Sequence, residues 1–271
     1  MKMIPFTKMV ASGNDFVVIE PKAARINLKA LAQKACDRKF GIGADGLLVV
    51  GKSRVADVKM RIFNADGSEA EMCGNGARCV ALFVSAQHKA PYNTQATIDT
   101  RAGVIHAEVH GDNVKINLTD PKALRLEVPI KVGTRTLRVN CINTGVPHAV
   151  VFVEGLDAID VKGLGAEIRY HKEFAPAGTN VNFVEVLNNT AIKVRTYERG
   201  VEDETLACGT GSTASALITS FMLQAPGTKL LHVHTRSREV LKVYFKEKND
   251  RFEDVWLEGR ARIVYTGVYY V

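Results

Sequence analysis

The feature that most constrains this chain is an internal repeat with a spacing of 135 residues. Two blocks each join a strand-like start and an acidic loop to the motif Cys-Gly-x-Gly, and their cysteines are Cys73 and Cys208. Two further pairs of apolar blocks keep nearly the same spacing: residues 16–20 with 150–154, and residues 47–50 with 183–186. Twice the spacing nearly equals the length of 271 residues. These matches predict a duplicated chain with two similar halves.

Each half carries the signals of mixed helix and strand structure. Asn27 is placed to cap a helix from Leu28 to about residue 40, whose apolar side chains share one face. A helix is also expected after each Cys-Gly-x-Gly motif, at residues 77–89 and 212–223, apolar enough to be the buried centre of its half. Short apolar or alternating runs predict strands at residues 15–20, 46–51, 58–63, 95–100, 104–109, 113–118, 136–142, 149–154, 182–187, 191–197, 229–235, 239–246, 254–259 and 262–270.

Turn residues between these strands, as at residues 110–113, indicate hairpins and therefore largely antiparallel sheets. The segment Asp120-Pro121-Lys122 has the composition of a linker. We therefore predict an α+β fold with two pseudo-symmetric halves, residues 1–119 and residues 120–261.

The composition is that of an ordinary globular protein, with 46% hydrophobic and 24% charged residues. The net charge of +7 is diffuse and no aromatic stacking motif accompanies it, so no nucleic-acid partner is expected. Five cysteines without CxxC or CxH spacing suggest neither a disulfide framework nor a metal site. The first residues lack the apolar core of a signal peptide, and no stretch approaches a membrane span. We expect a cytoplasmic protein with free thiols and no membrane contact.

The repeated cysteines carry the strongest chemical signal. Each precedes a helix whose first N–H groups and positive dipole end can lower the pKa of a thiol. A single cysteine of this kind is more often a packing residue, but a symmetric pair suits the inversion of a carbon that bears hydrogen, which needs a base on one face and an acid on the other. The carboxylate beside that carbon would be held by backbone amides of Gly74, Asn75, Gly209 and Thr210. Such a thiol pair works without a cofactor.

Three other segments are candidate substrate-binding loops. Residues 13–15 precede a strand, whereas residues 64–67 and 198–200 end the strands that lead to the two cysteines. The alternatives are an ordinary turn at residues 64–67 and a surface ion pair between Glu198 and Arg199. His148 is either a group that tunes a nearby thiolate or a turn residue.

The remaining motifs favour structural roles. Residues 41–46 match GxGxxG, but they follow a helix and lead into a strand, which is the reverse of the dinucleotide-binding order. His232 and His234 share one face of a strand and are expected to face solvent rather than a metal. The other three cysteines fall on apolar helix or strand positions and are expected to pack in cores: Cys36, Cys79 and Cys141.

With these motifs assembled, the chain resembles the diaminopimelate epimerase family over nearly its whole length. The most specific block runs from Phe63 to Arg78, and residues 12–16, 37–46 and 198–211 add to it. The resemblance implies that each half is a barrel-like sheet around a central helix, that the last strand, about residues 262–271, returns to the first half, and that the active site lies between the halves. It implies interconversion of LL- and meso-2,6-diaminopimelate without cofactor or metal, in lysine and peptidoglycan precursor biosynthesis, and a homodimer.

The resemblance also assigns roles by motif. Cys73 and Cys208 resemble the acid and base, with His148 and Glu198 placed to tune or orient them. The residues that resemble the family's backbone donors to the reacting carboxylate are Gly74, Asn75, Gly209 and Thr210. The residues that resemble the readers of the distal end of the substrate are Asn14, Asn64, Asn180, Glu198 and Arg199.

One departure bears on specificity. Val146 stands where the family usually carries an asparagine that helps to read the distal end, and Asn143 or Thr144 is a candidate substitute. If Val146 reflects a different substrate, the alternative is another cofactor-independent amino-acid racemase or isomerase. Outside enzymes, the alternative is a redox-sensing disulfide in a binding protein. The sequence leaves open which thiol is deprotonated at rest, because the two halves are nearly equivalent.

Overall fold

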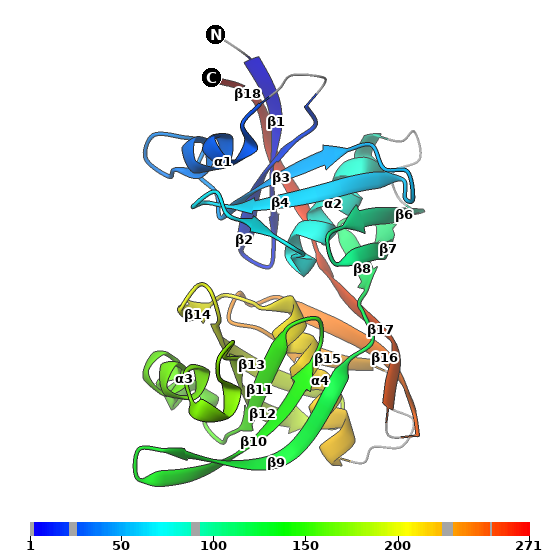
Figure 1. Ribbon diagram of the computed structural model, residues 1–271. Helices are drawn as coiled ribbons and strands as arrows, with labels where there is room; N and C mark the ends of the chain where they lie inside the picture. Colours follow the sequence, from blue (N-terminus) through cyan, green and yellow to red (C-terminus); the bar gives the residue numbers. More distant parts are fainter. Residues whose placement is uncertain (1–2, 22–25, 88–92, 224–229, 250) are drawn as a thin grey trace. The chain divides into compact units, whose positions relative to one another are not determined.

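The computed structural model describes residues 3–21, 26–87, 93–223, 230–249 and 251–271. The chain divides into two compact units (Figure 1): Met1–Ile116 with Gly259–Val271, and Asn117–Glu258. The sequence predicts these divisions three residues later, at 119/120 and 261/262. Within the described ranges, no helix combines the length and the apolar character needed to cross a membrane.

The first unit combines a curved sheet with two helices. Its helices are α1 (Leu28–Cys36) and α2 (Gly74–Gln87). Its strands are β1 (Met3–Ala11), β2 (Asn14–Ile19), β3 (Gly46–Gly51), β4 (Val58–Asn64), β5 (Glu69–Ala70), β6 (Asn93–Thr100), β7 (Gly103–His110), β8 (Asn113–Asn117) and β18 (Arg262–Tyr270).

The second unit has the same kinds of elements in the same sequence order, except that its first strand takes the sheet position that the last strand, β18, takes in the first unit. Its helices are α3 (Val161–Arg169) and α4 (Gly209–Leu223), with short 3₁₀ turns at Leu156–Ala158 and Lys172–Phe174. Its strands are β9 (Lys122–Val132), β10 (Arg135–Asn143), β11 (Pro147–Phe152), β12 (Asn180–Asn188), β13 (Ala191–Glu198), β14 (Asp203–Thr205), β15 (Leu230–His234), β16 (Val240–Lys248) and β17 (Arg251–Arg260).

Strand pairing follows one scheme in both units. The order in the first unit is β18-β1-β2-β3-β4-β6-β7-β8. The order in the second unit is β9-β10-β11-β12-β13-β15-β16-β17. Each order contains two parallel pairings, β2–β3 and β4–β6 in the first and β11–β12 and β13–β15 in the second. The prediction of two similar halves with largely antiparallel sheets is confirmed.

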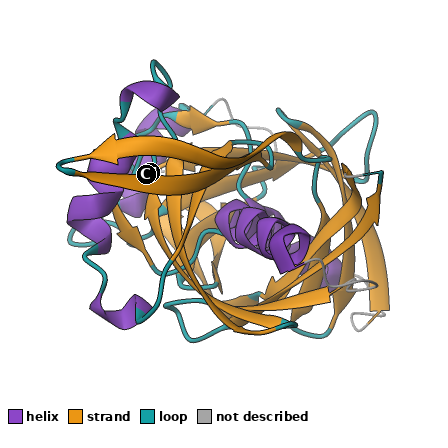
Figure 2. Ribbon diagram, turned by 90° about the horizontal axis from the view of Figure 1, so that it is seen from below, coloured by secondary structure: helices purple, strands orange, loops and turns teal. Residues whose placement is uncertain are grey.

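A helix lies inside the sheet of each unit. Strands β1 to β4, β6, β7 and β18 pack around α2, and strands β10 to β13, β15 and β16 pack around α4. Figure 2 shows α4 running through a ring of strands. Most side chains of both helices are buried, which is typical of a helix without a hydrophilic face. The predicted central helices and the barrel-like sheets around them are therefore confirmed.

Both central helices begin three residues earlier than the sequence predicts, at Gly74 and Gly209. The reason is that the carbonyl oxygens of Cys73 and Cys208 already accept the first helical hydrogen bonds, at 2.8 Å in each case. The motif glycines therefore belong to the helices. The predicted end of the first helix, at residue 89, lies outside the described residues.

Helix α1 begins as predicted and ends early. The Asn27 side chain accepts a hydrogen bond from the Ala30 N–H at 3.1 Å, so the predicted cap is confirmed. The helix ends at Cys36 rather than near residue 40. The Asp37 carboxylate accepts the N–H groups of Lys39 and Phe40 instead, and such a local turn competes with helical hydrogen bonding.

The sequence missed strand β1, strand β9, helix α3 and the short strands β5 and β14. Lys122, placed in the predicted linker, is the first residue of β9. In β1, both faces are buried over residues 6–9, so no polar alternation marks the strand, and Lys8 interrupts the apolar run. Because of both features, the segment lacks the alternation of apolar and polar residues that predicts a strand.

The repeat also differs in register from its sequence pattern. Strand pairing places residues in rows: Val17, Leu47 and Phe63 in the first unit, and Ala149, Val181 and Tyr197 in the second. The spacing between equivalent residues is 132 in the first pair and 134 in the other two. The sequence pattern pairs residues 16–20 with 150–154 at a spacing of 134, and residues 47–50 with 183–186 at a spacing of 136. Each of these predicted spacings is therefore two residues longer than the spacing in the structure. A shift of two keeps every side chain on the same face, so the apolar pattern alone does not detect it.

Candidate active site

The two repeated cysteines occupy the same position on equivalent helices. Each is the residue before the first helical residue, with its carbonyl oxygen accepting the N–H of the fourth residue along. The sulfurs therefore stand beside the first-turn amides, which have no intrahelical acceptor, and beside the positive end of the helix dipole. Neither forms a disulfide, and Cys73 is half-buried whereas Cys208 is buried.

A paired arginine and glutamate fix the strand that leads to each cysteine. Arg61 on β4 makes two hydrogen bonds to Glu69 on β5, at 2.8 and 2.9 Å, and these lower the pKa of Glu69. Arg195 on β13 makes the same pair with Glu204 on β14, at 2.7 and 2.9 Å. Sequence reasoning missed both pairs, although the arginines repeat with a spacing of 134 residues and the glutamates with one of 135.

The surroundings of the two sulfurs differ. The Cys73 Sγ lies 3.8 Å from the amide oxygen of Asn14. The Cys208 Sγ accepts a hydrogen bond from the Gly211 N–H at 3.4 Å and lies 3.5 Å from the Thr210 hydroxyl. The predicted site residues Asn14 and Cys73 are thus in contact in the first unit, and Thr210 and Cys208 in the second.

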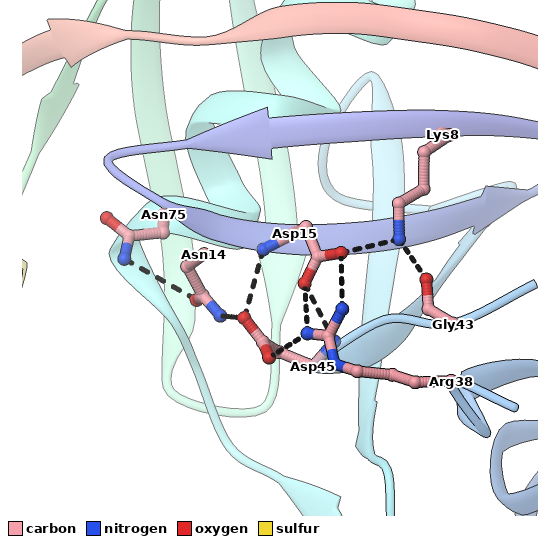
Figure 3. A network of polar contacts seen from close by, with 7 residues as sticks. All are labelled: Lys8, Asn14, Asp15, Arg38, Gly43, Asp45 and Asn75. Carbon is pink, nitrogen blue, oxygen red and sulfur yellow. Dashed lines mark hydrogen bonds and ion pairs between the residues drawn. The ribbon is translucent and has the colours of Figure 1, made fainter. Parts of the chain in front are cut away.

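Asn14 and Asn75 belong to a polar network on the first unit (Figure 3). The Asn14 Nδ2 donates to Asp45 at 2.7 Å, and the Asn75 Nδ2 donates to the Asn14 Oδ1 at 3.5 Å. The network continues through Arg38, which binds Asp45 at 2.6 Å. Sequence reasoning did not single out Asp45 or Arg38.

Asn64 lies at the end of β4, where its Nδ2 donates to the Ser68 hydroxyl at 2.9 Å and its carbonyl oxygen accepts the Gly67 N–H. These contacts form the turn into β5. Its predicted role in reading the substrate stays a prediction.

In the second unit, Asn180 and Arg199 come together. The Asn180 Oδ1 accepts the backbone N–H of Arg199 at 2.9 Å, and its Nδ2 donates to the Pro147 carbonyl at 3.1 Å. Glu198 is half-buried at the end of β13, and its carbonyl accepts the N–H of Glu202 at 2.8 Å. Asn180 therefore fixes the backbone of the predicted substrate-binding segment rather than projecting freely from it.

His148 is almost fully buried on β11, beside Asn180 on β12. Asn182 donates to the Ala149 carbonyl and accepts from the Thr196 hydroxyl, so its amide has one orientation, and its Nδ2 donates to the His148 Nδ1 at 3.1 Å. The imidazole proton therefore sits on Nε2, an atom that is buried and has no hydrogen-bond partner within the described ranges. Burial and the charge of Arg199 lower the pKa of His148 to about 3, so the ring is neutral at physiological pH.

Asn182 also explains why Gly211 is a glycine. A Cβ on Gly211 would lie 2.2 Å from the Asn182 Oδ1, which is held by its own hydrogen bond. Thr144, a suggested substitute for the missing family asparagine, is buried and donates to the Thr210 carbonyl at 3.0 Å. Asn143 accepts the Gly145 N–H. Both substitutes therefore support the local backbone.

The other three cysteines pack in the cores as predicted. Cys36, Cys79 and Cys141 are all buried. Burial raises the pKa of Cys36 to about 11 and raises that of Cys141. The GxGxxG segment, residues 41–46, connects α1 to β3 and its Gly43 carbonyl accepts from Lys8, which fits the structural role predicted for it.

One cavity of the second unit lies away from the predicted site residues. This cavity of about 510 Å³ is lined by residues 120–124, Ile142 and residues 251–253, which include none of the predicted site residues. Across the part of the chain that the structure describes, no three His, Cys, Asp or Glu side chains are grouped to hold a metal ion.

Comparison with known proteins gives one consistent family. The sequence model of the family described as "Diaminopimelate epimerase" matches residues 6–124 and 140–264. A diaminopimelate epimerase of Aquifex aeolicus is 42% identical over 275 residues, covering 97% of this chain and 96% of the relative. One of Caldanaerobacter subterraneus is 43% identical over 280 residues, covering 97% and 98%.

Solved structures agree on the fold. A phenazine biosynthesis protein of the PhzF family from Bacillus anthracis matches with a TM-score of 0.79 at 17% identity, covering 100% of both chains. A hydroxyproline epimerase from Agrobacterium vitis matches with a TM-score of 0.74 at 17% identity, covering 98% of this chain and 92% of the other. At such identities the likeness concerns the fold alone, and it supports the two-unit α+β architecture.

Proposed function

Because this chain belongs to the diaminopimelate epimerase family, we propose that it interconverts LL- and meso-2,6-diaminopimelate by proton transfer between two cysteines and the substrate α-carbon. The observation that carries the two-cysteine mechanism is the equivalent placement of Cys73 and Cys208 before two buried helices in a duplicated fold. The reaction serves lysine biosynthesis.

The proton chemistry balances without a cofactor. One cysteine, as a thiolate, removes the α-proton from one face of the carbon and becomes a thiol. The other cysteine, as a thiol, donates its proton to the opposite face and becomes a thiolate. The enzyme holds one thiol and one thiolate before and after the reaction, and the substrate leaves with an inverted α-carbon.

The carbanion formed between these steps needs electrostatic stabilisation, because general acid–base help alone contributes only about 10²–10⁴-fold. The amides of Gly74, Asn75, Gly209 and Thr210 are first-turn helix donors, suited to the carboxylate next to the reacting carbon. Each preorganised donor of this kind is worth about 3 kcal/mol of transition-state stabilisation.

The distal amino and carboxylate groups of the substrate need separate partners, because they distinguish diaminopimelate from other amino acids. The proposed readers are Asn14, Asn64, Asn180, Glu198 and Arg199. The support for Arg199 is that its backbone is fixed by Asn180 while its side chain is charged and half-buried. We propose that Glu198 and His148 orient the thiols. A neutral His148 would orient a thiol by packing and hydrogen bonding, because it carries no charge at physiological pH.

Deuterium exchange tests this function. Purified protein is incubated in D₂O with LL- or meso-diaminopimelate, and deuterium at the α-carbon is followed by NMR while the isomer ratio is followed by chromatography. We expect both deuterium incorporation and epimerisation, and neither in the C73S variant. A protein that binds diaminopimelate without exchanging its α-proton would be a binding module, and the proposal would be wrong.

Another amino acid is the second candidate substrate, favoured by Val146 at a position where an asparagine would read the distal end. The same exchange assay with a panel of free amino acids separates the two candidates. Faster exchange with a shorter amino acid than with diaminopimelate would favour this second candidate.

We further propose a homodimer in the cytoplasm. Large hydrophobic side chains are exposed on β18 and beside it on β1: Met3, Ile263, Val264, Tyr265, Val268 and Tyr270. A strand that exposes such residues is a common interaction surface. Both catalytic thiols must stay reduced, which suits a reducing compartment. Sedimentation of the V264E variant tests the dimer, and a monomer is expected where the unmodified chain gives a dimer.

A further inference from the structure

A chain of four side chains leads from a buried arginine to an acidic residue and passes the sulfur of Cys73. The Arg78 guanidinium donates to the Asn75 Oδ1 at 2.5 Å, and the Asn75 Nδ2 donates to the Asn14 Oδ1 at 3.5 Å. The Asn14 Nδ2 donates to Asp45 at 2.7 Å. Figure 3 shows the contacts among Asn75, Asn14 and Asp45.

The two ends of this chain fix the direction of every hydrogen bond in it. A guanidinium can only donate, so the oxygen of Asn75 faces Arg78 and its NH₂ group faces Asn14. A carboxylate can only accept, so the NH₂ group of Asn14 faces Asp45 and its oxygen faces the other way. Both ends require the same orientation of Asn14. Its oxygen is consequently turned to the Cys73 Sγ, 3.8 Å away.

Asp45 is itself held in place. Arg38 binds it at 2.6 Å, and the backbone N–H of Asp15 donates to it at 3.1 Å. Arg38 and Lys8 also bind the Asp15 carboxylate, at 2.8 and 2.6 Å. Although burial alone would raise the pKa of Asp15, these bonds outweigh it and lower that pKa to about 2, so the carboxylate stays charged.

The orientation of Asn14 has a chemical consequence. A carbonyl oxygen accepts a hydrogen bond from an S–H group and repels a thiolate, so it favours the protonated form of the cysteine. The helix dipole acts on both cysteines alike, because both occupy the same position before a helix. At Cys208 the Gly211 N–H points at the sulfur, which favours the thiolate.

We propose that Asp45 and Arg78 are positioning residues that hold the Asn14 oxygen against Cys73, so that Cys73 is the thiol and Cys208 the thiolate in the free enzyme. The proposal rests on the proposed function for its mechanistic meaning. In the first proton transfer of a free enzyme molecule, Cys208 then removes the α-proton and Cys73 supplies the new one. The charged groups of the network around Asn14 are Lys8, Asp15, Arg38, Asp45 and Arg78. Glu71, two residues before Cys73, is exposed.

The test measures the pH at which each cysteine becomes reactive. Alkylation by iodoacetamide is followed over a pH series, and the modified peptides are quantified by mass spectrometry. Cys73 is measured in the C208A background and Cys208 in the C73A background, so that neither titration is coupled to the other. We expect the midpoint of Cys73 to lie above that of Cys208 by about one pH unit. A midpoint for Cys73 at or below that of Cys208 overturns the proposal.

A double-mutant cycle separates positioning from simple charge removal. D45A changes a half-exposed side chain, so the fold should survive, and unfolding temperature checks this. We expect D45A and N14A each to lower the midpoint of Cys73 by about one unit, and the double variant to lower it no further. Additive shifts would mean that Asp45 acts by its charge alone, and no shift in D45A would mean that it does not act. Either result overturns the role of Asp45.

The outcome is independent of the test of function. Alkylation midpoints require no substrate, whereas α-proton exchange requires no particular resting state. An enzyme that epimerises diaminopimelate but shows equal midpoints keeps the proposed function and loses this inference.

Discussion

The network that reaches Cys73 in the first unit includes charged side chains, whereas the one behind Cys208 in the second unit consists of neutral ones. The charged members of the first are Lys8, Asp15, Arg38 and Asp45, and Asn14 connects them to Cys73. Asn182, Thr196 and His148 form the second. The strand order and the helix that carries the cysteine are the same in both. The two units therefore share the fold around the cysteine and differ in the electrostatics of the side chains that support it.

The largest expected effect tests whether the two copies are equally necessary. We expect C73S and C208S each to reduce epimerisation by about 10²–10⁴-fold or more, because serine is far less acidic than cysteine and each proton transfer needs its own thiol. Steady-state assays in both directions measure this, with circular dichroism as a check on folding. Near-normal turnover by either variant would show that a single cysteine is enough for epimerisation.

The second effect separates the units by their response to acid. The pKa of His148 is lowered from 6.5 to about 3, so the unfolded chain takes up a proton that the folded one refuses, and stability falls between these pH values. The pKa of Asp15 is lowered from 3.8 to about 2, so its contribution is full above 3.8 and is lost only as the pH falls toward 2.

The second unit should therefore lose stability at milder pH than the first. Its free energy of unfolding should fall by up to about 1.4 kcal/mol per pH unit, because one proton is taken up on unfolding. Hydrogen exchange of the amides in α4 and α2, followed by mass spectrometry at neutral and mildly acidic pH, measures each unit. The H148N variant should reduce the difference. Equal loss of protection in both helices would contradict this.

The third effect compares glycines that stand at equivalent positions before the helix interior. A Cβ on Gly211 would lie 2.2 Å from the Asn182 Oδ1, whereas one on Gly76 would lie 3.0 Å from a methyl group of Leu48. We expect G211A to destabilise the protein by about 3 kcal/mol, because the amide of Asn182 is hydrogen-bonded and does not yield. G76A should stay within about 1 kcal/mol, since alanine favours the helix and a leucine can shift. Urea denaturation gives both values.

The smallest effect concerns the paired arginine and glutamate of each unit. In the second unit the side chains of Arg195 and Glu204 are 17% and 8% exposed, whereas those of Arg61 and Glu69 are 40% and 23% exposed. We expect E204Q to cost about 1–2 kcal/mol and E69Q less than about 1 kcal/mol. Thermal unfolding of the two variants measures the difference, and the reverse order would show that burial does not set the strength of these pairs.

The sequence was informative wherever the physical signal is local. Asn27 caps α1 by a contact with a residue three positions along, and the Cys-Gly-x-Gly motifs mark the starts of α2 and α4. Strand β9 was missed because its burial is partial and because Pro121 precedes it and Pro129 interrupts it, both of which suggest loops.

Much of the candidate site depends on contacts between distant parts of the chain, and no local pattern encodes these. Arg78 follows Cys73 by five residues and looks like a surface residue of a helix, yet it is fully buried and binds Asn75 and Ser12. Asp45 lies in a segment that resembles a nucleotide-binding motif, and only the fold shows that it faces Asn14. Likewise, the neutral state of His148 follows from burial, which the sequence does not state.

The pairing of β18 with β1 has a consequence for synthesis on the ribosome. Met3 pairs with Tyr270, whereas the equivalent strands of the second unit, β9 and β10, are joined by a tight hairpin. The nascent chain can therefore complete the second unit while β1 still lacks its neighbour. Relative to the second unit the first is a circular permutation, because the strand equivalent to β9 stands at its end and the whole second unit is translated in between.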